Sequence, residues 1–456
     1  MDNTATLMAI SPLDGRYYEK MHTLRAIFSE YGLIKFRVTV EIQWLLMLIE
    51  FAELPELPAL SPHAQKLLTE IIESFSLQDA QRVKHIESGI NHDVKAVEYF
   101  IKERIAGNQE LAAIAEFIHF GCTSEDINNL AYGLMLKAAR TQCLLPALDD
   151  IIFTLKKLAH DHANVPMLAR THGQPASPTT IGKEIANVIA RLQRQIDQLN
   201  NVLLLGKLNG ASGNYNALAI AYPDVDWQCL SKKFVSKLGL AWNAYTTQIE
   251  PHDMCAEFFA VVQRINTILL DFNRDIWSYI SINYFQQKTL ANEVGSSTMP
   301  HKVNPIDFEN AEGNLGIANA LFEYFIAKLP ISRWQRDLSD STVLRNVGVA
   351  IGHTILAYQS TLKGISKLAP NLPIIAADLD HHWEVLGEAI QMVMRRYQLE
   401  QPYEKLKAFT RGKTIDQKTL QQFIQTLDLP EDVKNQLLSL TPSGYIGYAA
   451  QLAKRI

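Results

Sequence analysis

Residues 295–305 read GSSTMPHKVNP, and this stretch joins several reactive and binding groups in one short segment. Gly295 permits backbone conformations that other residues avoid, and it leaves N–H groups open to a ligand. The hydroxyls of Ser296 and Ser297 follow it, and Lys302 adds an ammonium group. We call residues 295–305 the signature segment. Its side chains predict a site that binds an anion and moves a proton.

Ser296 has two possible roles in this segment. A serine hydroxyl is a weak base, so a catalytic Ser296 would need nearby N–H donors, Lys302 and a site closed to water. The alternative is that Ser296 and Ser297 only cap a helix. The lysine, the amide of Asn304 and the helix expected after it favour the catalytic role.

The composition is that of an ordinary globular protein. The chain has 456 residues, of which 47% are hydrophobic and 20% charged, and this length allows about three domains. A net charge of −5 gives no overall attraction to nucleic acid or to an anionic membrane. An anionic substrate would therefore be held by locally clustered arginine, lysine and backbone N–H groups.

The chain lacks the patterns of metal sites, disulfide frameworks and membrane segments. Its four cysteines are widely spaced without a CxxC pair, which predicts reduced thiols in the cytoplasm. No HExxH motif occurs, and we expect no metal site. The N-terminus lacks the apolar core of a signal peptide, and no apolar run approaches a membrane span. Without a GxxxxGK[ST] or GxGxxG motif, a bound nucleotide would be a substrate.

Long stretches without helix breakers dominate the chain. Residues 253–294 contain no glycine or proline, and their apolar positions recur at steps of three and four. A hydroxyl and a proline, Ser177 and Pro178, suggest the start of another helix. Alternating strand patterns are almost absent, and residues 241–249 are the best candidate for an extended segment. We expect five long helices that form a bundle. The apolar faces of such long helices usually exceed what one subunit can cover, so we also expect a homo-oligomer. The helices expected are 124–163 with a bend at Pro146, 177–205, 253–294, 307–328 and 341–367.

Two breaks in the helical pattern predict three all-α domains. Gly107 and Asn108 separate an N-terminal helical region from the long helices, and the PNLP sequence at 370–373 ends the long-helix region. The expected domains are residues 1–111, residues 112–368 with the signature segment, and residues 369–456.

Polar clusters elsewhere in the chain are further candidates. His172 lies between Thr171 and Gly173-Gln174-Pro175, so it belongs to a loop, and its ordinary pKa near 6.5 suits proton donation. A structural histidine is the alternative. Thr123 and Ser124 precede two acids, which predicts a helix N-cap that can also bind an anion. Asn91, His92 and Asp93 form another polar group, for which a solvated helix start is the alternative.

Two segments that contain arginine suggest phosphate binding. Asp14-Gly15-Arg16-Tyr17 is one of them, and residues 333–345 contain three arginines together with the hydroxyls of Ser341 and Thr342. The guanidinium group suits bidentate contact with phosphate. A solvated charged face is the alternative. The candidates in the second group are Arg336, Ser341, Thr342 and Arg345.

The signature segment closely resembles the GSSxMPxKxNP pattern of the fumarase/aspartase superfamily. Fumarases and aspartases show MPGK in this segment and argininosuccinate lyases MPQK, whereas MPHK with His301 is similar to the adenylosuccinate lyase family. The resemblance extends from end to end. It is found in SPLDGRY, NHDVKAVEYF, GCTSEDINN, RTHGQPASPTTIGKE, TTQIEPHD and RWQRDLSDSTVLRN.

The resemblance implies a fold, a reaction and an assembly. The fold is a three-domain, all-α fumarase/aspartase-like one, whose five long helices assemble into the core of a homotetramer. The reaction releases fumarate from adenylosuccinate, giving AMP, and from succinylaminoimidazole carboxamide ribotide, without a cofactor. Each complete active site draws on three subunits.

The resemblance also implies roles for individual residues. Ser296 would be the general base, and His172, oriented by Glu309, the general acid. Lys302 would help to hold the charge that develops on the substrate carboxylate. The implied substrate-binding residues are Arg16, Tyr17, Asn91, His92, Asp93, Thr123, Ser124, Gln248, Ser297, Asn304, Arg336, Ser341, Thr342 and Arg345.

Three other functions compete with this one. Another fumarate-releasing lyase, such as argininosuccinate lyase, is disfavoured by His301 and by the arginines of 333–345. A non-catalytic helical scaffold is disfavoured because the proton-transfer residues are all retained. A nucleic-acid-binding bundle is disfavoured by the net charge.

Overall fold

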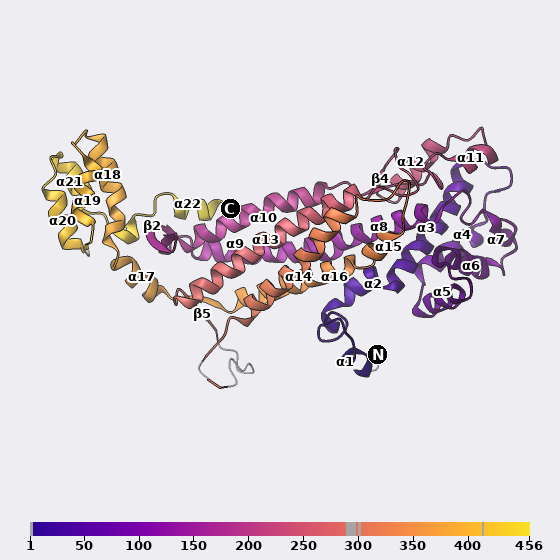
Figure 1. Ribbon diagram of the computed structural model, residues 1–456, viewed down its shortest axis with the longest axis horizontal. Helices are drawn as coiled ribbons and strands as arrows, with labels where there is room; N and C mark the ends of the chain where they lie inside the picture. The colour runs from indigo at the N-terminus through magenta and orange to yellow at the C-terminus, as the bar shows by residue number, and fades with distance from the viewer. Residues whose placement is uncertain (1–2, 289–297, 300–301, 413–414) are drawn as a thin grey trace. The chain divides into compact units, whose positions relative to one another are not determined.

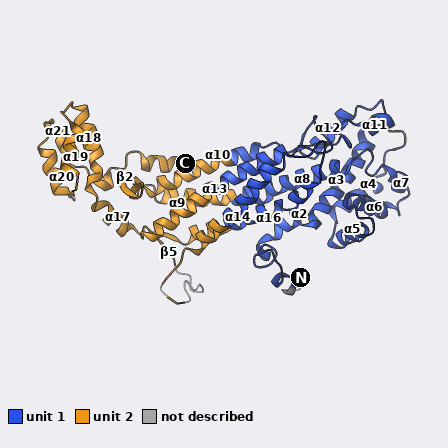
Figure 2. Ribbon diagram, viewed as in Figure 1, with its two compact units in different colours: residues 1–147, 196–267, 314–357 blue, residues 148–195, 268–313, 358–456 orange. Residues whose placement is uncertain are grey.

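The computed structural model describes residues 3–288, 298–299, 302–412 and 415–456, and helices dominate it (Figure 1). The chain forms two compact units, each built from three separate stretches (Figure 2). Unit 1 comprises Met1–Ala147, Ile196–Thr267 and Asn314–Ala357. Unit 2 comprises Leu148–Gln195, Ile268–Gly313 and Tyr358–Ile456. The all-α fold class expected from the sequence is confirmed, whereas the domain limits at 111 and 368 stay a prediction.

Unit 1 contains the N-terminal helices. Ser29 and Ser76 cap α3 and α5 through their side-chain oxygens, the N-cap chemistry expected of serine. α3 packs against α8, and its fully buried Trp44 donates from Nε1 to the carbonyl of Phe120 at 3.0 Å. The helices are α1 (Asn3–Leu7), α2 (His22–Phe28), α3 (Glu30–Phe51), α4 (Pro62–Glu73), α5 (Leu77–Ile90), α6 (Asp93–Ile105), α7 (Gln109–Ala113), α8 (Ser124–Ala139), α11 (Asn216–Ala221), α12 (Trp227–Lys237) and α15 (Ser339–Leu344).

Unit 2 contains the C-terminal helices and two small antiparallel sheets. The sheets pair β1 (Pro166–Thr171) with β2 (Gln174–Thr180), and β5 (Phe285–Gln287) with β6 (Leu368–Pro370). The helices are α17 (Leu372–Asp380), α18 (Gly387–Arg396), α19 (Pro402–Thr410), α20 (Gln417–Gln425), α21 (Glu431–Leu438) and α22 (Ala449–Arg455).

Five long helices each have residues in both units. They are α9 (Leu145–Asp161), α10 (Ile181–Asn201), α13 (Asp253–Ser281), α14 (Ile306–Lys328) and α16 (Val347–Ser366). Every residue of α16 from 351 to 358 is buried, so this part of the helix is enclosed on all sides. Buried polar pairs join it to α13: Asn266 donates to Thr354 at 3.0 Å in unit 1, and Asn273 donates to Thr361 at 3.1 Å in unit 2.

The helical run expected over 124–163 is confirmed, with an irregularity next to its proline. α8 ends at Ala139, a π turn spans Arg140–Leu144, and α9 begins at Leu145. Pro146 lacks an N–H group and its ring crowds the carbonyl four residues earlier. A π turn directly before it relieves that conflict.

Three expected helix limits were wrong. α13 ends at Ser281 rather than 294, because Asn283 takes a left-handed φ of 60° and β5 then pairs with β6. α10 begins at Ile181, since Ser177 and Pro178 belong to β2, and Thr180 Oγ1 accepts from Lys183 N at 3.1 Å instead. Residues 341–367 form α15 and α16 rather than one helix.

The extended segment expected near 241–249 is confirmed in part. β4 (Ala241–Trp242) pairs in parallel with β3 (Leu205–Gly206), and the residues that follow β4 form a loop. This loop carries Gln248, so the short β pairing helps to place a predicted site residue within unit 1.

Candidate active site

The N-terminus of α8 is the centre of the candidate site in unit 1. Thr123 precedes the helix, and its backbone N–H donates to Asp126 Oδ2 at 2.8 Å. Gln248, from the loop after β4, donates from Nε2 to Thr123 Oγ1 at 3.3 Å. Ser124 begins the helix, and the helix dipole at this end favours an anion. The structure therefore brings together three of the predicted binding residues.

Arg336 joins this group through a buried carboxylate. Its guanidinium lies 3.0 Å from Glu125 Oε1, and Asn128 Nδ2 also donates to that oxygen at 2.7 Å. Asp340 lies 4.0 Å from Arg336 and 3.2 Å from the ring of His252. The cation is thus held beside Ser124 by carboxylates that are themselves almost fully buried.

Asp93 and Arg345 form a second charged group in unit 1. Asp93 Oδ2 lies 2.7 Å from Arg37 and 3.3 Å from Arg345, which also pairs with Glu30 at 2.7 Å. Burial alone would raise the pKa of Asp93, but Arg37 and its hydrogen bonds outweigh burial and hold that pKa below its usual value. Asp93 therefore stays ionised at neutral pH and fixes two arginines.

The neighbours of Asp93 cap helices. His92 Nδ1 accepts from the N–H of Lys95 at 3.2 Å, so it caps α6, and its side chain stays half exposed. Asn91 ends α5 with a left-handed φ of 54°. The helix start expected as the alternative is confirmed at His92 and Asp93, whereas Asn91 ends the preceding helix. This capping leaves an exposed imidazole at the start of α6.

The N-terminal arginine segment lies beside Arg345. A cavity of about 330 Å³ is lined by Ser11, Asp14, Arg25, Ser29 and Arg345, with apolar side chains between them. The guanidinium of Arg16 lies 5.7 Å from the centre of the Tyr17 ring. Ser341 lies in α15, the short helix that ends just before Arg345, and Thr342 follows it. The predicted phosphate-binding segments are thus neighbours in unit 1.

His172 stands at the tip of a β-hairpin in unit 2. His172 and Gly173 form the two-residue turn between β1 and β2, with φ values of 53° and 74°. Both angles are positive, as in a type I′ turn, and this conformation is uncommon for a histidine. The side chain is exposed at the tip. The loop position predicted for His172 is confirmed, and the turn presents an imidazole with free access to a ligand.

Lys302, Asn304 and Glu309 lie around the start of α14 in unit 2. Lys302 N donates to Met299 O at 3.0 Å, and its side chain is exposed. Glu309 Oε1 accepts from Trp277 Nε1 at 3.0 Å. His172 and Glu309 both belong to the described part of the chain, and no hydrogen bond joins them within it. Ser296 and Ser297 lie outside the described residues.

Several residues of the unit 1 group had no counterpart in the sequence prediction. Glu125 holds Arg336 and accepts from Asn128. Arg37 holds Asp93 while its Nε donates to Asn128 Oδ1 at 2.8 Å. Glu125 follows Ser124 directly, so its place in the first turn of α8 could have identified it from the sequence. Arg37 lies within α3 and carries no local pattern that distinguishes it.

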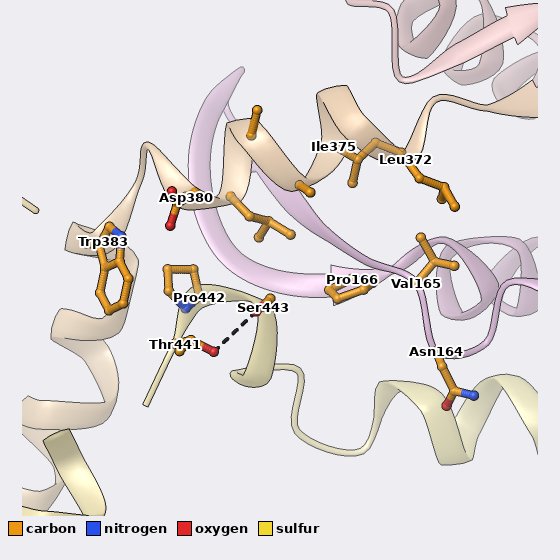
Figure 3. Close-up of a pocket in the computed structure, with 13 residues that line it drawn as sticks. Asn164, Val165, Pro166, Leu372, Ile375, Asp380, Trp383, Thr441, Pro442 and Ser443 are labelled. Atoms are coloured by element: carbon orange, nitrogen blue, oxygen red, sulfur yellow. Dashed lines mark hydrogen bonds between the residues drawn. The ribbon is translucent and has the colours of Figure 1, made fainter. Parts of the chain in front are cut away.

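A separate cavity of about 630 Å³ lies in unit 2 and contains none of the predicted site residues (Figure 3). Its walls are mainly apolar side chains of α17, with Trp383, Pro166 and Pro442, and Asp380 stands at one side.

The described part of the chain contains neither a metal-binding cluster nor a membrane-spanning helix. Among the residues described, no three His, Cys, Asp or Glu side chains are grouped so that they could hold a metal ion. Within those residues, every helix is too short or too polar to cross a bilayer.

Solved structures share this architecture. A fumarate lyase from Mesorhizobium sp. BNC1 superposes with a TM-score of 0.76 at 18% identity, covering 95% of this chain and 97% of that one. The 3-carboxy-cis,cis-muconate lactonizing enzyme from Pseudomonas putida gives 0.74 at 21% identity, covering 95% of each chain. Residues 15–318 also match the model of the lyase family. Fold and family match together define an enzyme, a lyase of the fumarase/aspartase type.

Sequence relatives narrow this class. Residues 332–446 match the adenylosuccinate lyase C-terminal family. The adenylosuccinate lyases of Escherichia coli K12 and Vibrio cholerae are each 58% identical to the chain, and that of Haemophilus influenzae is 57% identical. In each case 99% of both sequences is covered. The chain belongs to the adenylosuccinate lyase family.

Proposed function

We propose that the chain eliminates fumarate from adenylosuccinate, giving AMP, and from succinylaminoimidazole carboxamide ribotide, giving aminoimidazole carboxamide ribotide. In each reaction Ser296 removes a proton from the succinyl carbon next to a carboxylate. The C–N bond then breaks, its electron pair leaves with nitrogen, and His172 protonates that nitrogen. The carbon skeleton departs as fumarate, so atoms and electrons balance without an added reactant.

One observation carries this proposal: Thr123, Ser124, Gln248 and Arg336 converge on the N-terminus of α8. Proton removal next to a carboxylate places a second negative charge on that group. Fixed N–H groups, hydroxyls and a cation stabilise such charge without reorganising, and this is usually the largest catalytic contribution. Lys302 and Asn304 are proposed to supply the remaining donors.

The second charged group suits the other end of the substrate. A nucleotide monophosphate carries two negative charges, and bidentate arginine contacts recognise it. Arg345, Arg16, Ser341 and Thr342 are proposed to bind the phosphate, with Tyr17, Asn91, His92 and Asp93 at the ribose and base. Asp93 forms an ion pair with Arg345, so the guanidinium is already oriented before the substrate arrives.

The proposed site is shared between subunits of a homotetramer. Within unit 1, α14 exposes a row of small and apolar residues, and Ile317 and Tyr324 are 50% and 54% exposed. A Cβ placed on Gly316 would meet no atom within 4 Å. A bare glycine beside exposed apolar side chains suits the close approach of a second helix. The row consists of Gly316, Ile317, Ala320, Tyr324 and Ala327.

The pairing of His172 with Glu309 belongs to the same proposal. No bond joins these two described residues within one chain, and a general acid needs a partner that orients its ring. We infer that Glu309 of one subunit orients His172 of another. A cytoplasmic location stays a prediction from the sequence.

Substitution of the two proton-transfer residues tests the assignment. Each of Ser296→Ala and His172→Ala should lower kcat for adenylosuccinate by about 10²–10⁴-fold, the usual contribution of a general base or acid. Ser366→Ala and His160→Ala, at exposed helix positions of unit 2, are matched controls that should keep the wild-type rate. A Ser296→Ala enzyme that keeps more than a few per cent of wild-type kcat would remove serine as the base.

A further inference from the structure

The hairpin that carries His172 has little support at its tip. Thr171, His172 and Gly173 are all exposed, and the side chains around the turn do not form a core. A general acid must nevertheless be held within a fraction of an ångström of its target, because small misplacements cost large factors in rate. The hairpin therefore needs an anchor behind the turn.

Asp378 of α17 provides such an anchor. It binds Arg170, which lies two residues before His172 in the sequence. Its Oδ2 lies 2.5 Å from the guanidinium of Arg170 on β1, and the hydroxyl of Tyr284 donates to the same oxygen. The Arg170 guanidinium also lies 5.8 Å from the centre of the Tyr284 ring. Asp378 thus ties the strand leading to His172 to α17 and to Tyr284.

The surroundings of Asp378 make this anchor rigid. Tyr284 is 1% exposed, and its ring stacks on Tyr279 with centres 6.0 Å apart. Burial raises the pKa of Tyr284 to about 12, so its hydroxyl stays a donor across the neutral range. His382 Nδ1 lies 3.4 Å from Asp378 Oδ1. Arg170 and Asp378 are each less than one-third exposed, which limits screening by solvent.

A second carboxylate secures the other strand of the hairpin. Ser177 of β2 donates to Glu388 Oε2, and Tyr445 donates to the same oxygen at 3.0 Å. Both strands are therefore attached to residues beyond position 370, each through one carboxylate that also accepts from a tyrosine. Of these two carboxylates, Asp378 is the one that binds β1, the strand that enters the turn directly before His172.

We propose that Asp378 is a positioning residue for the elimination, which holds the imidazole of His172 in place through Arg170. This inference rests on the proposed role of His172 as general acid. In this role Asp378 acts through its contact with Arg170 rather than through contact with the substrate. It fixes the strand whose last residues set the direction in which the imidazole points, and so it acts on protonation of the leaving nitrogen rather than on substrate binding.

The effect of Asp378→Asn should depend on the presence of His172. The asparagine keeps the size and one acceptor but loses the charge that holds Arg170. In the wild-type background we expect kcat to fall about tenfold or more and KM to change less than threefold. In the His172→Ala background, measured by single turnover with enzyme in excess, the same substitution should change the rate less than twofold.

Controls separate positioning from general stability. Leu379→Ala removes the neighbouring buried side chain of α17 and leaves the Arg170–Asp378 contact, so it should lower the melting temperature without the loss in kcat. Asp378→Glu, which keeps the charge, should recover part of the rate. Equal losses for Asp378→Asn in both backgrounds, or an unchanged kcat, would overturn the inference. A His172→Ala enzyme of wild-type rate would instead overturn the proposed function.

Discussion

The ammonium group of Lys207 lies 2.9 Å from the carboxylate of Asp126, and neither side chain is exposed to solvent. The same carboxylate accepts from the backbone N–H groups of Thr123, Asn209 and Gly210, at 2.8, 2.9 and 3.1 Å. One fully satisfied buried ion pair therefore fixes the turn that begins α8. This turn presents the hydroxyls proposed to bind the substrate carboxylate.

Loss of one partner of this pair should destabilise the fold strongly. Lys207→Met leaves the Asp126 charge buried without its cation, and removing one member of a buried pair costs about 3–5 kcal/mol. Urea unfolding monitored by circular dichroism measures the change. Arg82→Gln is the matched control, since Arg82 pairs with Glu103 at 2.6 Å on the surface, where solvent screens the pair and the loss should be much smaller. Equal losses for both variants would contradict this assignment.

Arg345 should contribute to substrate binding more than to turnover. Arg345→Ala removes a guanidinium proposed to contact the phosphate, and a hydrogen bond to a charged group contributes about 1.5–3 kcal/mol. We expect KM for adenylosuccinate to rise by about 10–100-fold with a smaller change in kcat. Arg104→Ala, which breaks a contact with Asp79 of 2.7 Å in the same unit, should leave KM unchanged. A fall in kcat at constant KM would argue against phosphate binding by Arg345.

The exposed row on α14 should be needed for assembly. Gly316→Leu adds a large side chain where the single chain has open space, so the chain should still fold while a neighbouring helix is pushed away. Sedimentation velocity should show the loss of tetramers, together with a loss of activity. Gly89→Leu, at a glycine of α5 that is also open, should keep the wild-type assembly. Tetramers of normal stability for Gly316→Leu would contradict the proposed interface.

His119 should make stability depend on pH. Burial opposes its charged form, but the carboxylate of Glu41, 2.6 Å away, outweighs burial and raises the pKa of His119 above its ordinary value of 6.5. A raised pKa contributes stability that is fully present below pH 6.5 and is lost as pH rises through the folded-state pKa. Urea unfolding of the wild type should show this decline, and Glu41→Gln should flatten it.

Glu50→Gln, an exposed position on the same helix as Glu41, is the control and should keep the decline. Parallel curves for the wild type and Glu41→Gln would show that the pair does not supply the pH dependence.

The sequence motifs predicted the proposed binding residues of the unit 1 site better than the residues that support them. Thr123, Ser124, Gln248 and Arg336 come from distant segments, and the structure brings them together. Their supports could not be predicted, because residues such as Arg37 are defined by contacts across long sequence separations. A motif marks the side chains that touch a ligand, whereas the charges that orient them follow from packing.

The limits of the helices also depend on contacts between residues far apart in the sequence, which local patterns do not reveal. Residues 282–294 contain no glycine or proline, so nothing local indicates that α13 ends at Ser281. The end depends on Asn283 in a left-handed conformation and on pairing of β5 with a strand more than eighty residues later. Likewise, Ser177-Pro178 suits a helix start locally, but the hairpin of His172 recruits both residues into β2.

The central claim is that Ser296 and His172 act together in one site but come from different subunits. Mixing inactive Ser296→Ala tetramers with inactive His172→Ala tetramers, under conditions of verified subunit exchange, tests it directly. Random hybrids should regain about one quarter of wild-type activity, because about one site in four would draw both residues from unmodified positions. No recovery after complete exchange would show that both residues of a site belong to one chain.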